Sequence, residues 1–172
     1  LGVLLSRQQY QSLQPRLLNS SRVLSAIYQD PPASRQLQLA ALLLPTAQRV
    51  GFLYQGDDAK ALTELQQLIQ QRNGQLQARL VPGSGELPAA LVEVIERSDF
   101  LLASADAALY NRYTIKTILT AAYRQEKVLI GSSPAFVKAG SLATTYSTVQ
   151  HIARQVDEWL AQHPPGEPIR LP

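Results

Sequence analysis

The sequence predicts an α/β fold, a doubly wound and mostly parallel sheet with helices on both faces. Short apolar runs that suit buried strands alternate with amphipathic stretches that suit helices, at roughly 20–30 residues per unit. Polar or glycine-containing loops follow the apolar runs, as at residues 55–58 and 104–106. This alternation is typical of right-handed β-α-β crossovers, which make successive strands parallel.

The strands are expected where short apolar or alternating runs are bounded by Gly, Pro, Ser or Asp. The run FLLA at residues 100–103 contains no polar residue, so we expect it to be a central strand, buried on both faces. In chain order, the expected strands are residues 1–5, 23–28, 50–54, 76–81, 100–103, 127–130 and 142–146.

The first and last helices are predicted from capping residues. Residues 7–21 contain Pro15, so they predict a short helix or a loop. Ser34 is expected to cap the next helix, and Pro45 to end it. The final helix begins after Ser147 or Thr148, either of which can cap it.

The middle helices follow the same rules. Asp57 or Asp58 is expected to cap a helix that ends at Asn73-Gly74, with the glycine in the left-handed conformation. Asp106 is expected to open a long helix. Three middle helices are expected, each with one apolar stripe. The first stripe is Leu62, Leu65, Leu68 and Ile69, the second is Leu87, Leu91, Val94 and Ile95, and the third, in the helix from Asp106, is Ile115, Ile118, Leu119 and Ala122.

Composition excludes several classes of function. The chain has 172 residues, 45% hydrophobic and 17% charged, which is enough for one substantial core. Its net charge is +3 with scattered basic residues and 6% aromatics, a poor pattern for nucleic-acid binding. Without cysteine it has no thiolate nucleophile, cysteine-ligated zinc or disulfide. The longest apolar run, residues 39–44, is far too short to span a membrane.

Histidine chemistry is also poorly supported. The sequence contains only His151, expected on an exposed helix face, and His163, expected in the Pro-rich tail. A Ser-His pair or a histidine metal site would need one of these two residues. We therefore expect no catalytic residue, no metal site and no cofactor, and the chain is predicted not to be an enzyme.

Four loops are expected at the carboxyl ends of the strands, where open α/β sheets bind small ligands. They lie at residues 55–58, 82–85, 104–106 and 131–133, and carry amide, hydroxyl and carboxylate groups with few cations. The loop Gly83-Ser84-Gly85 has no following Lys, so it matches neither a phosphate-binding P-loop nor a dinucleotide fingerprint.

The carboxylates in these loops allow two interpretations. Asp106 can serve only as a helix cap, or it can also pair with a ligand ammonium, because a cap uses one carboxylate oxygen. The same ambiguity holds for Asp57 and Asp58. A magnesium pocket like that of response regulators would need a Lys at the end of a late strand, whereas Lys127 begins its strand.

Other loop residues are also open to two interpretations. Tyr54 can offer its ring to a ligand or simply pack at the sheet edge, and Ser132 and Ser133 suit a turn before Pro134. The candidate ligand-binding residues are Tyr54, Gln55, Gly56, Asp58, Ser104, Asp106 and Ser132.

Three segments carry a resemblance to a known family. They are RQLQLAALLLPTAQRVGFLY at residues 35–54, the apolar strand with Ser104-Ala105-Asp106, and VLIGSSPAFVKAGSLATTYS at residues 128–147. In this order and spacing the chain resembles the substrate-binding proteins of ABC transporters of the tryptophan/tyrosine-binding type. The resemblance covers about residues 23–162 and, by position, matches Asp106 to a polar cleft residue of the family.

The resemblance implies a Rossmann-like lobe of the type I periplasmic-binding fold, which has two α/β lobes around a ligand cleft. Residues 1–28 would be a remnant of the first lobe and the crossover, residues 29–163 the second lobe, and residues 164–172 a Pro-rich tail. Because the chain begins at Leu1 rather than Met, we expect a processed product or a fragment. Two unpartnered strands in residues 1–28 would also allow a homodimer through that segment.

The implied function is solute binding for an ABC importer. The ligand would be a small polar or aromatic molecule such as an amino acid, and the partners would be ABC permease subunits. The implied location is periplasmic or extracytoplasmic, with membrane association through the transporter. The alternative function is a sensory or accessory ligand-binding domain with the same fold and no role in transport.

Overall fold

The structure is a computed structural model that describes residues 2–17, 26–56, 59–83 and 85–162. The candidate Asp58, its neighbour Asp57 and the tail at 164–172 lie outside the described residues. The chain divides into a larger unit, Pro31–Thr145, and a smaller unit that combines Leu1–Asp30 with Tyr146–Pro172.

The larger unit is built on a five-stranded sheet with the order β4-β3-β5-β6-β7, and every neighbouring pair is parallel. The all-buried strand β5 lies at the centre, as its apolar run predicts. The α/β, mostly parallel fold predicted from the sequence is confirmed. The strands are β3 (Arg49–Tyr54), β4 (Gln75–Leu80), β5 (Phe100–Leu102), β6 (Leu129–Gly131) and β7 (Ala143–Thr144).

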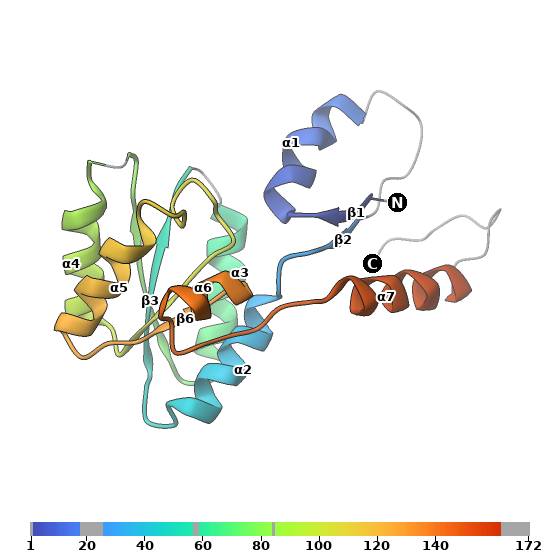
Figure 1. Ribbon diagram of the computed structural model, residues 1–172. Helices are drawn as coiled ribbons and strands as arrows, with labels where there is room; N and C mark the ends of the chain where they lie inside the picture. The colour runs from blue at the N-terminus through green and yellow to red at the C-terminus, as the bar shows by residue number, and fades with distance from the viewer. Residues whose placement is uncertain (1, 18–25, 57–58, 84, 163–172) are drawn as a thin grey trace. The chain divides into compact units, whose positions relative to one another are not determined.

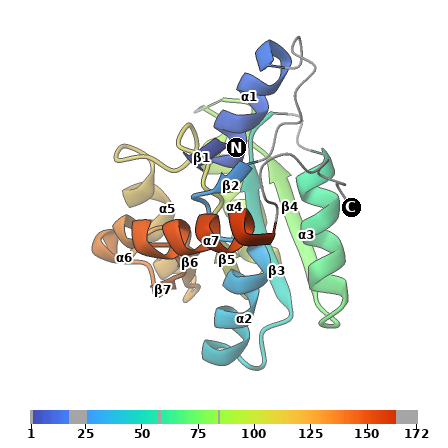
Figure 2. The same ribbon diagram turned by 90° about the vertical axis from the view of Figure 1, so that its right-hand side faces the viewer.

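Helices cover both faces of this sheet (Figures 1 and 2). On one face lie α2 (Ala33–Leu43) and α3 (Ala59–Gln70), and on the other lie α4 (Leu87–Arg97) and α5 (Ile115–Arg124). The short helix α6 (Pro134–Ala139) connects β6 to β7 and packs Phe136 into the α4–α5 side.

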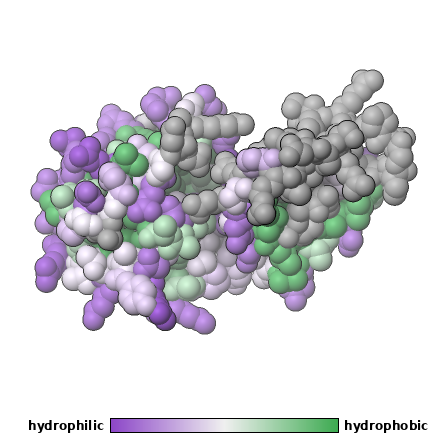
Figure 3. Space-filling model, turned by 90° about the horizontal axis from the view of Figure 1, so that it is seen from above, coloured by the Kyte–Doolittle hydropathy of each residue, from purple (hydrophilic) through white to green (hydrophobic). Residues whose placement is uncertain are grey.

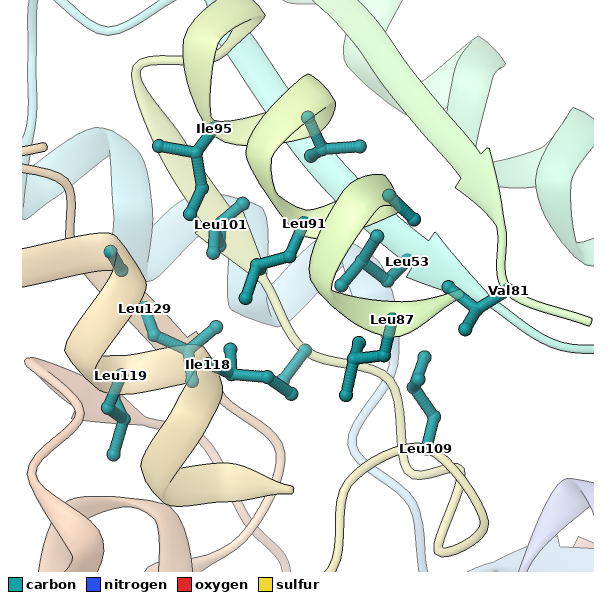
Figure 4. Packing of buried hydrophobic residues seen from close by; sticks show 14 of the residues in the cluster. Leu53, Val81, Leu87, Leu91, Ile95, Leu101, Leu109, Ile118, Leu119 and Leu129 are labelled. Atoms are coloured by element: carbon teal, nitrogen blue, oxygen red, sulfur yellow. The ribbon is translucent and has the colours of Figure 1, made fainter. Parts of the chain in front are cut away.

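Alternating strand residues supply the two cores. Leu53 and Leu101 point to the α4 side, where Figure 4 shows them beside Leu87 and Leu91 of that helix. Phe100 and its neighbour Leu102, together with other strand residues, pack on the α2–α3 side. Because both faces are covered, the sheet leaves only its edges and strand ends for polar chemistry.

The start of α2 differs from the expectation. Ser34 lies inside the helix, and Pro32 occupies the N-cap position with φ −64° and ψ 140°, without a side-chain capping bond. Proline is already fixed near this φ, so the backbone can turn into the helix without a hydroxyl cap. The helix ends at Leu43, just before the predicted stop at Pro45.

At the end of α3 a left-handed residue is present, as predicted, but it is not the predicted one. Asn73, not Gly74, is left-handed, with φ +57°. The Gly74 N–H donates to the Ile69 carbonyl at 3.0 Å, which closes a Schellman motif. Gly74 is required for close packing, because a Cβ there would lie 2.9 Å from the Gln48 carbonyl oxygen.

The helix predicted from Asp106 begins only at Ile115. Between them, the Asp106 carboxylate accepts the Ala108 N–H at 2.8 Å, and the Asn111 side-chain oxygen accepts the Tyr113 N–H at 2.9 Å. Short polar side chains that bind their own backbone compete with helical hydrogen bonds. The segment therefore forms a series of turns above the sheet edge.

The smaller unit contains β1 (Gly2–Leu5), α1 (Arg7–Leu17), β2 (Ala26–Tyr28) and α7 (Val149–Gln162), with β1 and β2 parallel. A capping box starts α1: the Gln9 N–H donates to Ser6 Oγ at 3.0 Å, and the Ser6 N–H donates to Gln9 Oε1 at 2.8 Å. Of the two predicted caps for α7, the Thr148 hydroxyl accepts the His151 N–H at 3.2 Å.

The two units divide the chain differently from the predicted lobes. The prediction keeps residues 29–163 together, whereas the structure divides the chain after Asp30 and after Thr145. The reason is that α7 packs against β1 and β2 of the smaller unit. Which family lobe each unit corresponds to stays a prediction.

A polar clamp joins β3 and β5 at the amino-terminal edge of the sheet. The Asp99 carboxylate accepts the backbone N–H groups of Gln48 at 2.9 Å and Arg49 at 2.8 Å, and the Arg49 guanidinium lies 2.7 Å from its other oxygen. Burial alone would raise the pKa of Asp99. The Arg49 side chain and the two N–H groups outweigh burial and lower this pKa from 3.8 to about 2.

We expect Asp99→Asn to lower the free energy of unfolding by roughly 1–2 kcal/mol at pH 7, a value reduced for solvent screening because the Arg49 side chain is 48% exposed. The folded-state pKa lies below the unfolded one, so this stability is present above about pH 4 and is lost as pH falls toward 2. Urea unfolding at pH 7 and near pH 2 measures it. Glu96→Gln, on the exposed face of α4, is the control, and a gap between wild type and Asp99→Asn that persists at pH 2 would contradict the account.

Gly131→Ala tests the close approach of α6 to β6. A Cβ at Gly131 would lie 2.4 Å from the Phe136 Cβ, so the helix must shift, which we expect to destabilise the fold by about 1–3 kcal/mol. Gly85→Ala is the matched control, since its Cβ would meet nothing within 4 Å. Thermal melts of both variants give the comparison, and equal melting temperatures would refute this packing.

Candidate functional site

The carboxyl ends of the five parallel strands gather at one edge of the larger unit. At this edge the chain leaves β3 toward α3 on one face and leaves β5 toward α5 on the other. Because β3 and β5 are neighbours, the loops after them diverge, which is the topological switch point where such sheets bind ligands. Figure 3 shows the molecule from above the view of Figure 1, with hydrophilic, intermediate and hydrophobic residues interspersed over this face.

Three predicted residues lie together at the end of β3. Tyr54 is the last residue of the strand, and its carbonyl accepts the Val81 N–H at 2.9 Å. Tyr54 and Gln55 are partly exposed. Gly56 is exposed with φ +70°, a conformation that favours glycine, and a Cβ there would meet nothing within 4 Å.

Three further predicted residues come together across β5 and β6. The Ser132 hydroxyl donates to the Ser104 carbonyl at 3.0 Å, although 28 residues separate them. The Ser104 hydroxyl lies 3.4 Å from the Asp106 nitrogen, which donates to it. Ser132 is buried, while Ser104 and Asp106 are partly exposed. The structure therefore brings together Ser104, Asp106 and Ser132 as one polar group.

Asp106 has a structural role that leaves part of its carboxylate available. Its Oδ1 accepts the Ala108 N–H at 2.8 Å, and its carbonyl accepts the Tyr110 N–H at 2.8 Å. No hydrogen bond to Oδ2 occurs within the part of the chain that the structure describes. The carboxylate thus caps a turn rather than a helix, and one oxygen remains for a second partner.

Tyr110 connects this loop to the end of β3, and sequence reasoning missed it. Burial and the nearby Asp106 carboxylate raise the pKa of Tyr110, while a backbone hydrogen bond at Leu53 acts in the opposite direction. The Tyr110 ring packs 5.7 Å from that of Phe136. Its position in the sequence, inside an expected helix, gave no indication of this role.

Gln36 of α2 is the second residue that sequence reasoning missed. It is 4% exposed, and its side-chain nitrogen donates to the Ala103 carbonyl at 3.1 Å and the Gly131 carbonyl at 3.0 Å. The sequence contained an indication of this buried amide, since Gln36 is a polar residue beside Leu37 and one turn from Ala40 on the buried helix face. Such a residue is normally hydrogen-bonded.

The chemistry of this edge suits ligand binding. It offers a carboxylate oxygen, hydroxyl groups and backbone carbonyls, which accept hydrogen bonds from an ammonium or hydroxyl group. The sequence contains only two histidines, and both fall outside the larger unit, so the serines at this edge have no histidine base within it. Among the described residues, no cluster of His, Cys, Asp or Glu could hold a metal ion.

Two solved structures have a similar fold. The ABC domain from Streptococcus pneumoniae, in complex with L-Trp, aligns with a TM-score of 0.64 at 18% identity, over 84% of this chain and 50% of that one. A conserved domain protein from Vibrio cholerae O1 biovar El Tor str. N16961 aligns with a TM-score of 0.65 at 18% identity, over 96% of this chain and 64% of that one. The chain therefore spans half to about two thirds of these structures.

Comparison with protein families assigns the chain more directly. None of the curated proteins matches it. In the described segments, no helix has the length and apolarity needed to cross the membrane. The family model of the ABC transporter substrate binding protein matches residues 13–157, which include Gln36 and the loops at residues 104–106 and 131–133. The resemblance predicted from the sequence is confirmed, and the chain belongs to the ABC transporter substrate binding protein family.

Proposed function

We propose that this protein is the solute-binding component of an ABC importer and that it binds a small polar or aromatic molecule, such as an amino acid, at the carboxyl edge of the larger unit. The observation that carries the proposal is the convergence of Ser104, Asp106 and Ser132, from two strands, at the switch point of a parallel sheet. Membership of a substrate-binding family, which is not an enzyme family, supports solute binding without catalysis.

The ligand class follows from the groups at this edge. Asp106 supplies a carboxylate with one oxygen unused within the described residues, and a ligand ammonium would satisfy it. The partly exposed Tyr54 ring, at the end of β3, offers an apolar surface. A related fold was solved with L-Trp, so an aromatic amino acid is the first ligand to test.

The remaining parts of the proposal follow from the family. The partners would be ABC permease subunits, and the protein would work outside the cytoplasm, associated with the membrane through its transporter. The homodimer through residues 1–28 has no support in the family match and stays a prediction. The alternative, a ligand-binding domain without transport, predicts the same binding but no permease-dependent uptake.

Calorimetric titration with L-tryptophan and with indole-3-propionate, which lacks the ammonium, tests the ligand class. We expect L-tryptophan to bind at least about tenfold more tightly, because a carboxylate-ammonium hydrogen bond contributes roughly 1.5–3 kcal/mol. Equal binding of the two compounds would contradict a role for the carboxylate. Binding of neither compound would direct the search to other amino acids and count against an aromatic ligand.

Asp106→Asn separates the structural role of this residue from the binding role. Asparagine keeps the side-chain oxygen that accepts the Ala108 N–H, so the melting temperature should be nearly unchanged. Affinity for L-tryptophan should fall about ten- to hundredfold. Glu86→Gln, an exposed carboxylate at the start of α4, is the control and should retain affinity. Unchanged affinity in Asp106→Asn would leave Asp106 with a structural role only.

A further inference from the structure

The side chain of Gln36 is buried at an unusual place for an amide. It lies one turn into α2, on the face that packs Leu37 and Ala40 against the sheet, and only 4% of the residue is exposed. Its nitrogen faces two backbone carbonyls, which can only accept hydrogen bonds. These partners fix which end of the amide is the donor, and both of its N–H groups are used.

The two carbonyls lie where the pairing between β5 and β6 stops, and on the other side of β6 Gly131 still pairs with Thr144 of β7. Leu102 pairs with Ile130, and the Ala103 N–H donates to the Ile130 carbonyl at 2.9 Å, which is the end of the ladder between β5 and β6. The Ala103 and Gly131 carbonyls lie at this end, and both residues are buried. Buried carbonyls need donors, and Gln36 supplies one to each.

The residues that follow these carbonyls are those of the candidate site. Ala103 directly precedes Ser104, and Gly131 directly precedes Ser132. The Ser132 hydroxyl then makes the next connection, to the Ser104 carbonyl at 3.0 Å. Side chains therefore continue the pairing of β5 and β6 beyond the ladder, into the two loops that carry the polar group.

We propose that Gln36 is a positioning residue of the ligand site: it fixes the spacing between the loop at residues 104–106 and the loop at residues 131–133. The expected effect of Gln36 on ligand affinity rests on the proposed function. Its expected effect on the loops does not. Gln36 needs no contact with the ligand, because it acts through the two carbonyls that it holds.

The first test measures the loops without ligand. Gln36→Met keeps a side chain of similar length and removes both donors, so we expect backbone amides at residues 104–106 and 132–133 to exchange hydrogen at least about tenfold faster. Asp99→Asn is the matched control, since it removes the charge that pairs with Arg49 and so weakens the clamp between β3 and β5 at the opposite edge. It should loosen residues 48–49 and leave the loops unchanged.

The second test measures affinity for L-tryptophan in the same two variants, under conditions in which both remain folded. Gln36→Met should bind at least about tenfold more weakly than wild type, and Asp99→Asn should bind as wild type does. A purely structural role would lower the melting temperature of both variants and change the affinity of neither. Should Gln36→Met not fold, Gln36→Asn gives the same comparison, because its shorter amide cannot reach both carbonyls.

The outcomes separate the two proposals. Faster loop exchange with weaker binding supports the positioning role. Unchanged loop exchange overturns it, and so does faster exchange with unchanged affinity. If wild type binds neither L-tryptophan nor any other amino acid, the proposed function fails, and the exchange measurement alone decides whether Gln36 holds the loops.

Discussion

The structure depends on one constraint, the burial of both faces of a parallel sheet. All three residues of β5 are buried, and its side chains alternate between the α4–α5 core and the α2–α3 core. A strand placed in this way has no surface for polar groups along its length. Its only polar neighbours lie where it begins and where it ends, and the chain places Asp99 before β5 and Ser104 after it.

Polar groups join neighbouring strands at both ends of the sheet, but through different kinds of interaction. At the amino-terminal edge an ion pair between Arg49 and Asp99, supported by backbone N–H groups, joins β3 to β5. At the carboxyl edge neutral groups, Gln36 and Ser132, join β5 to β6. A neutral amide can be buried with all its donors satisfied, whereas a buried charge would need a partner in the low-dielectric interior. The Asp106 carboxylate, one oxygen of which accepts no hydrogen bond from the described residues, lies at the partly exposed end of this arrangement.

The α/β class and the central position of β5 follow from local sequence patterns. The uninterrupted apolar run at residues 100–103 predicts a central strand, and polar loops after the strands predict the ligand edge. The prediction of the central strand is confirmed, because burial on both faces is a property of that segment by itself, whereas the ligand edge stays a prediction. Ser104 and Ser132 are then neighbours, since β5 pairs with β6.

The parts that sequence could not predict depend on distant or competing hydrogen bonds. The acceptors of Gln36 lie 67 and 95 residues away, so no local pattern connects them. The turns after Asp106 replace a helix because the Asn111 side chain binds backbone N–H groups that a helix would use. The apolar stripe of Ile115, Ile118, Leu119 and Ala122 was interpreted correctly, but the polar side chains that precede it determine the geometry of the loop.

The candidate site is consequently held by hydrogen bonds at the ends of β5 and β6, whereas the loop after β3 has open space around Gly56. Gln36 and Ser132 join the ends of β5 and β6 by hydrogen bonds in which three carbonyls accept. At the end of β3, Gly56 has a left-handed backbone with no atom near the position of a Cβ. Substitutions at such a loop alter the ligand edge without disturbing either core. Under the proposed function we therefore expect ligand preference to vary at residues 54–56, while the β5–β6 side holds the carboxylate and the hydroxyl groups in place.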